Sequence, residues 1–129
     1  MTRNRKSARE AGTRFETLVA DYLAKHVDDR IERRRLSGKG DRGDIGGLRH
    51  MTQRVVIEVK DYGGQIKASE WVREAEVERG NDDAGVGIVV AKRRGTSNPA
   101  DQFVLMTLGD FASLLKGDRD HLVDSEVAE

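Results

Sequence analysis

The sequence Val55-Val56-Ile57-Glu58-Val59-Lys60 decides the fold of this chain. The stretch is rich in β-branched residues and too short for an isolated helix, so we expect a β-strand. Because side chains alternate along a strand, Glu58 and Lys60 share one face, and Ile57 and Val59 share the other. A strand this apolar belongs in the centre of a sheet, where two charges are costly unless they are paired or bind a metal.

A turn-rich acidic segment, Gly40-Asp41-Arg42-Gly43-Asp44-Ile45, precedes this strand. We expect Asp44 to lead into a short strand whose pairing brings its carboxylate near Glu58. Two carboxylates and the Val59 carbonyl are oxygen ligands of the kind that Mg²⁺ or Mn²⁺ prefers. Lys60 beside such a site can orient or deprotonate a water, or stabilise charge on a phosphate.

Asp44 followed by Glu58-Val59-Lys60 resembles the signature of the PD-(D/E)xK nuclease superfamily. The resemblance implies that Asp44 is the first acidic residue and that Glu58 and Lys60 form the acid–x–lysine element. It also implies that Asp44, Glu58 and the Val59 carbonyl bind the metal. Gly43 stands where the superfamily usually has proline, and this departure leaves Asp41 as a rival for the role of Asp44.

The first helix is predicted to begin near Ser7, because Ser7 and Glu10 have the spacing of a capping box. Its apolar residues fall within one arc at 3.6 residues per turn, and they are Ala8, Ala11, Phe15, Leu18, Val19, Tyr22 and Leu23. Glu16 lies at the border of this arc. It resembles the helix glutamate that often completes the metal site of the superfamily, as a catalytic residue and metal ligand. The alternative is a solvated or salt-bridged glutamate.

Basic residues form clusters, although 23 basic and 23 acidic residues give a net charge of zero. Residues 31–36 read as a strand with an arginine run, which is either a charged edge strand or a ridge that contacts phosphates. A glycine-rich loop and a later basic loop add further candidates. The predicted DNA-binding residues are Arg33, Arg34, Arg35, Lys39, Lys92, Arg93 and Arg94.

The rest of the chain predicts a strand–helix–strand unit with parallel strands. A helix over residues 67–79 packs through Trp71, and residues 85–91 form a core strand. Residues 102–108 form another strand, and a helix from Asp110 to Gly117 buries Phe111, Leu114 and Leu115. We therefore expect an α/β fold with a mixed β-sheet flanked by helices, and the resemblance implies that this sheet is restriction-endonuclease-like. It also implies a single nuclease domain over residues 1–117, and we expect residues 118–129 to be an acidic, flexible tail.

Composition excludes several classes of protein. The chain has no cysteine, which excludes disulfides, thiolate zinc sites and cysteine nucleophiles. We find no apolar run that could span a membrane and no signal peptide, and we expect a cytoplasmic protein, in the host cytoplasm if it is phage-encoded. The three histidines lack metal-ligand spacing, which argues against an HNH nuclease.

Overall likeness to archaeal-type and actinobacteriophage Holliday junction resolvases narrows the expected activity. It implies a Mg²⁺-dependent, structure-specific endonuclease that hydrolyses phosphodiester bonds in branched or double-stranded DNA. Nicks in two opposing strands require two active sites, so we expect a homodimer. The alternatives are a flap-cutting or restriction-like nuclease of the same superfamily, and a DNA-binding dimer whose carboxylates only form salt bridges.

Overall fold

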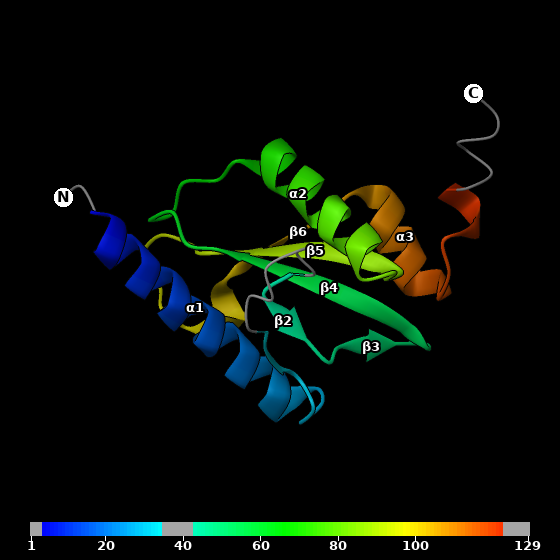
Figure 1. Cartoon of the computed structure of the whole chain (residues 1–129), viewed down its shortest axis with the longest axis horizontal. Coiled ribbons are helices and arrows are strands. Elements are labelled where there is room, and N and C mark those ends of the chain that lie inside the picture. Colours follow the sequence, from blue (N-terminus) through cyan, green and yellow to red (C-terminus); the bar gives the residue numbers. More distant parts are fainter. Residues whose placement is uncertain (1–3, 35–42, 123–129) are drawn as a thin grey trace.

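The chain forms a mixed α/β structure in which helices flank one six-stranded sheet (Figure 1). The computed structural model describes residues 4–34 and 43–122, so the predicted sites at Arg35, Lys39 and Asp41 lie outside the described residues. The elements are α1 (Arg5–His26), β1 (Glu32–Arg33), β2 (Ile45–Gly46), β3 (Arg49–His50), β4 (Gln53–Lys60), α2 (Ala68–Asn81), β5 (Val86–Ala91), the 3₁₀ helix η1 (Pro99–Asp101), β6 (Phe103–Leu105) and α3 (Leu108–Lys116). The predicted fold class, a mixed sheet flanked by helices, is confirmed.

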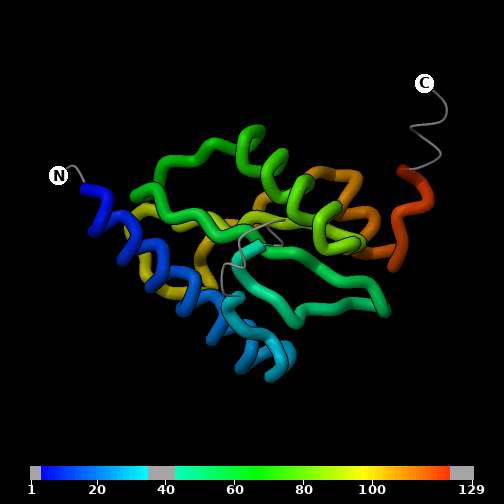
Figure 2. The backbone as a smooth tube through the Cα atoms, viewed as in Figure 1, coloured from blue at the N-terminus to red at the C-terminus, as the bar shows by residue number. Residues whose placement is uncertain are grey.

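The strand order is β1-β2-β4-β5-β6, and β3 pairs with β4 beside this path. The predicted parallel pair is confirmed, since β4 and β5 run parallel with Lys60 opposite Ala91. All other pairs are antiparallel. The chain reverses between β3 and β4 at Met51 and Thr52, whose φ angles are 50° and 72° (Figure 2). Two left-handed residues form the tight turn that matches the twist of a hairpin.

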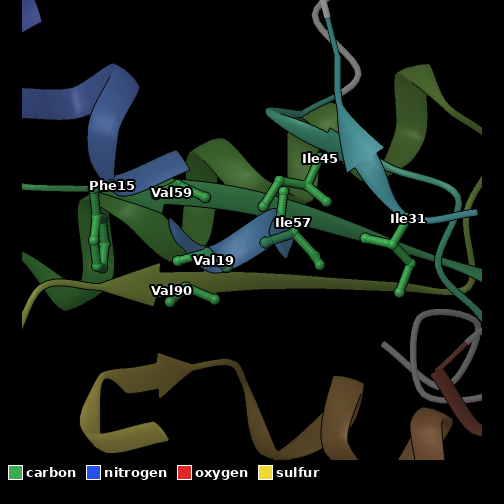
Figure 3. Packing of buried hydrophobic residues seen from close by; sticks show 8 residues of the cluster. Phe15, Val19, Ile31, Ile45, Ile57, Val59 and Val90 are labelled. Atoms are coloured by element: carbon green, nitrogen blue, oxygen red, sulfur yellow. The ribbon is translucent and has the colours of Figure 1, made fainter. Parts of the chain in front are cut away.

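Helix α1 covers one face of the sheet. Its N-cap is Asn4, whose side chain accepts a hydrogen bond from the Ser7 N–H, so the predicted start at Ser7 is three residues late. The core beneath α1 is aliphatic with one aromatic ring, and Figure 3 shows its members: Phe15, Val19, Ile31, Ile45, Ile57, Val59 and Val90. Ile57 and Val59 therefore point towards α1, as strand alternation predicts.

Helix α2 packs on the opposite face. Its buried Trp71 and Ala75 contact Val89 and Ala91 of β5. A Cβ at Gly87 would lie 2.8 Å from the Ala75 carbonyl oxygen, so glycine at this position allows the helix to approach the strand closely. The Glu58 and Lys60 side chains lie on this α2 face, because their neighbours Ile57 and Val59 point to the other one.

Helix α3 buries a different side from the one that the sequence predicted. Its C-cap at Gly117 is confirmed, with φ 93° in the left-handed region. Phe111 and Leu115 are exposed, however, and the buried residues of α3 are Asp110 and Ser113. The physical reason is that these polar groups hydrogen-bond the beginning of β5, where β6 provides no backbone partner.

The residues that follow α3 also contact the fold, up to the last described residue. Arg119 donates hydrogen bonds to the Gly85 carbonyl at 2.7 Å and to Asp110 at 2.8 Å. Arg119, within the predicted tail, is therefore held against Gly85 and α3. No helix among the described residues has the length and apolar character needed to cross a membrane.

Candidate active site at the end of the central strand

The strand register puts Asp44, directly before β2, opposite Glu58 of β4. The register places Ile45 of β2 opposite Ile57 of β4. Both isoleucines belong to the core under α1, so the adjacent Asp44 and Glu58 project to the opposite face. The register agrees with the predicted pairing of these two residues, and their joint role as metal ligands stays a prediction.

The Asp44 carboxylate contacts the backbone of β4 directly. Its Oδ2 accepts a hydrogen bond of 2.7 Å from the Val59 N–H, and the Asp44 N–H donates to the Ile57 carbonyl at 2.9 Å. In an extended strand the N–H and C=O of one residue point to the same side. The Val59 carbonyl therefore points to the side of β4 on which Asp44 lies, as a metal ligand at this position requires.

Gly43 allows this close approach. Its φ is 91°, a left-handed conformation that proline cannot adopt. A Cβ at Gly43 would lie 2.8 Å from Val56 Cγ1 and 3.0 Å from the Ile57 carbonyl oxygen. A residue with a side chain would therefore push Asp44 away from β4.

Glu58 is buried with only part of its hydrogen-bonding capacity used. The residue is 7% exposed, and its Oε2 atom has no hydrogen-bond partner among the described residues. The other carboxylate oxygen, Oε1, lies 3.4 Å from Lys60 Nζ. Since buried carboxylate oxygens normally have partners, this oxygen identifies Glu58 as a site that can accept a cation or a donor.

Lys60 bridges two carboxylates. Its Nζ lies 2.6 Å from Glu74 Oε2 of α2, in addition to its contact with Glu58. Burial disfavours the charged amine, but the hydrogen bond to Glu74 and the negative charge of Glu58 outweigh it and raise the pKa of Lys60 above its ordinary value. Lys60 is therefore a cation at neutral pH, suited to holding a water or a phosphate oxygen and not to removing a proton.

Glu74 is a site residue that was not predicted, because no functional residue was expected on the helix that follows β4. The signal that would have found it is its spacing from Trp71, because residues three apart on a helix are neighbours. Trp71 is buried against the sheet, so Glu74 lies on the border of the buried face and reaches Lys60.

The predicted metal ligand Glu16 does not join the other acidic residues. Its Oε2 accepts a hydrogen bond from Arg33 Nε at 3.2 Å and lies 3.1 Å from Arg33 Nη2. This pair lies between α1 and β1, on the face opposite to Glu58. The structure thus shows the salt-bridged alternative for Glu16, and it places Arg33 beside α1 and not beside Lys60.

The other predicted DNA-binding residues fall into two groups. Arg34 donates to the buried Asp82 at 3.0 Å, and Lys92 donates to the carbonyls of Arg93 and Thr96, so both side chains hold the fold together. Arg93 and Arg94 are exposed in the loop after β5. Because the carboxyl ends of parallel strands share one edge, this loop follows Ala91 at the same edge of the sheet as Lys60.

The donor set fits a hard divalent ion with an incomplete protein shell. Asp44 and Glu58 supply two carboxylates, and Glu58 Oε2 is unsatisfied. Within residues 4–34 and 43–122, no group of three or more histidine, cysteine, aspartate or glutamate side chains could hold a metal. Mg²⁺ commonly binds one or two carboxylates and completes its shell with waters and substrate phosphates, so two carboxylates are sufficient for this ion.

Comparisons of the sequence and the structure with protein-family models, curated proteins and solved structures found no match.

Proposed function

We propose that the chain is a Mg²⁺-dependent, structure-specific DNA endonuclease of the PD-(D/E)xK type, with a four-way DNA junction as its preferred substrate. The observation that carries the proposal is the convergence of Asp44, Glu58 and Lys60 at the end of β4, with one buried oxygen of Glu58 unsatisfied. The preference for a junction rests on the sequence resemblance, and Mn²⁺ is the alternative metal.

The residues of the site have distinct roles in this proposal. Asp44, Glu58 and the Val59 carbonyl would hold the ion, which would supply a water of lowered pKa and positive charge near the scissile phosphate. Lys60 is a permanent cation that orients the attacking water or a phosphate oxygen. Hydrolysis adds that water to phosphorus and breaks the bond to the 3′ oxygen, which leaves as a hydroxyl. Glu74 holds the Lys60 ammonium in place through the 2.6 Å contact.

The exposed Arg93 and Arg94 supply the nearest positive surface to this site. Both follow β5 at the edge of the sheet where β4 ends. A Cβ at Gly64, in the loop after β4, would lie 2.7 Å from Arg94 Cβ, so the loops after the two strands are in contact. Phosphates that approach Lys60 would therefore pass these arginines, and binding should weaken steeply with salt.

The second candidate function is a DNA-binding protein without catalysis. The observation that favours it is the bridge from Glu58 through Lys60 to Glu74, which neutralises the lysine within the fold. In this case the carboxylates stabilise α2 against β4 and have no ligand. The two candidates differ in one measurable respect, because only the nuclease cuts DNA when Mg²⁺ is added.

The test is cleavage of labelled four-way junctions, flaps and linear duplexes in Mg²⁺, in Mn²⁺ and in EDTA. We expect paired symmetric nicks in the junction with either metal and none in EDTA. Asp44→Ala, Glu58→Ala and Lys60→Ala should abolish cleavage while junction binding persists. Glu76→Ala is the matched control, since Glu76 is an exposed α2 residue that pairs with Arg79. The proposal would be refuted if all three site variants cleaved the junction as well as the wild-type protein does. If flaps were cut as fast as junctions, the four-way junction would not be the preferred substrate.

A further inference from the structure

Helix α3 exposes its large apolar side chains to solvent and turns polar side chains towards the sheet. Leu108, Phe111 and Leu115 are 81%, 45% and 63% exposed. At 100° per residue these three positions lie within about 60° of one another, and we name them the α3 outer face. The buried residues Asp110 and Ser113 lie on the opposite side of the helix. The amphipathic helix is therefore inverted relative to the sheet.

Hydrogen bonds fix this orientation. Asp110 Oδ2 accepts from the Gly87 N–H at 2.9 Å, and Ser113 Oγ donates to the Gly85 carbonyl at 3.1 Å. Arg119 holds the same carboxylate and the same carbonyl. Rotation of α3 to bury its leucines would leave these buried polar groups without partners, which is unfavourable. The outer face is exposed because the opposite side of α3, with Asp110 and Ser113, provides hydrogen bonds to the backbone at the beginning of β5.

We propose that the α3 outer face is the contact surface between two copies of this chain. The residues recur at intervals of three and four, which is the spacing of a seam between two packed helices. A two-fold contact places the same patch on both partners, so an uncharged apolar stripe is complementary to itself. The chain has zero net charge, and no long-range repulsion opposes the approach of a second copy.

The available area suits a moderate, reversible dimer. The three side chains expose on the order of 350 Å² per copy, so two copies would remove about 700 Å² from water. This area is below the roughly 1,000 Å² of a specific, stable interface, so the contact between two copies is weak. We therefore expect dissociation in the micromolar range and not an obligate dimer.

The test is sedimentation of the full chain across micromolar concentrations, without metal or DNA. Leu115→Lys should raise the dimer dissociation constant about a hundredfold, because Leu115 enters a two-fold interface once from each copy. Val77→Lys is the matched control, since Val77 is a helical residue of α2 and is 61% exposed. It should leave the constant unchanged. Leu108→Glu is a second variant with the same expected effect, and circular dichroism checks that each variant is folded.

Two results would overturn the inference. Wild-type protein that stays monomeric at every concentration would show that another partner, or the chain's own C-terminus, covers the α3 outer face. Dimers that resist both substitutions would show that the second copy binds elsewhere. Because these measurements need neither DNA nor metal, they are independent of the nuclease proposal: a dimer without cleavage would refute only that proposal, and a monomeric nuclease would refute only this inference.

Discussion

Glu58 and Lys60 have unequal numbers of partners, and this inequality predicts that their substitutions change stability in opposite directions. Lys60 contacts two carboxylates, Glu58 at 3.4 Å and Glu74 at 2.6 Å. Glu58 contacts one cation and has a buried oxygen with no partner among the described residues. In metal-free buffer, Glu58→Met should therefore stabilise the fold, and Lys60→Met should destabilise it.

The magnitudes follow from the contacts. Removal of the unsatisfied Glu58 oxygen should recover about 1–3 kcal/mol, and loss of the longer Lys60 contact should cost about 1 kcal/mol. Lys60 keeps Glu74, so Glu58→Met should raise the free energy of unfolding by roughly 1 kcal/mol. Lys60→Met instead leaves the buried Glu58 charge without its cation, which costs about 3 kcal/mol or more.

Urea unfolding in EDTA, followed by tryptophan fluorescence, measures both changes. The single tryptophan, Trp71, is buried in the helix that carries Glu74, so its emission reports on the relevant interface. Glu76→Met is the control, because Glu76 is exposed on the same helix, and loss of its pair with Arg79 should cost no more than about 1 kcal/mol.

Addition of Mg²⁺ separates a metal ligand from a structural acid. At ten times the dissociation constant, Mg²⁺ should stabilise the wild-type protein by about 1.4 kcal/mol, and it should leave the Glu58→Met protein unchanged. The reasoning is refuted if Glu58→Met lowers the free energy of unfolding by more than about 1 kcal/mol in EDTA. Equal stabilisation of both proteins by Mg²⁺ would also refute it, since the ion would then bind elsewhere.

Three further substitutions test other parts of the structure. Asp44→Asn keeps an oxygen able to accept the Val59 N–H, so thermal unfolding should change by less than about 1 kcal/mol while junction cleavage is lost. Asp82→Ala removes a buried acceptor of Arg34 and should cost about 2–4 kcal/mol in urea unfolding. Arg93→Ala should reduce the slope of log affinity against log salt for junction DNA by about 1, as fluorescence anisotropy would measure.

The centre of the fold could be predicted because local sequence and tertiary environment agree there. The apolar stretches of β4 and β5 match strands covered on both faces, and the helix between them has a length that fits a parallel crossover. The position of Asp44 opposite Glu58 followed from the short strand expected after Asp44 and from strand alternation. These inferences depended only on the local geometry of a strand, in which the face that one side chain occupies determines the face of the next.

The Glu16 site and the α3 core were predicted less well, because their orientation depends on distant partners. Glu16 lies on the border of an amphipathic helix, a position compatible with either face, and Arg33 of β1 determines which contact forms. In α3 the apolar residues have helical spacing, which indicates an amphipathic helix without indicating which side meets the sheet. The backbone groups at Gly85 and Gly87 determine that side, and sequence periodicity does not reveal them.

The two proposals share one physical basis, since each rests on a place where the usual rule of burial is broken. Glu58 puts a buried oxygen inside the fold with no hydrogen-bond partner in residues 4–34 and 43–122, and the α3 outer face leaves large apolar side chains in water. Each arrangement destabilises an isolated chain, and each is expected where a sequence serves binding as well as folding.

The two arrangements call for different ligands, because a cation would stabilise the buried oxygen and an apolar surface would cover the exposed side of the helix. A ligand that corrects one violation should leave the other unchanged. Mg²⁺ should therefore raise stability without altering the dimer equilibrium, and Leu115→Lys should abolish dimers without altering stabilisation by Mg²⁺.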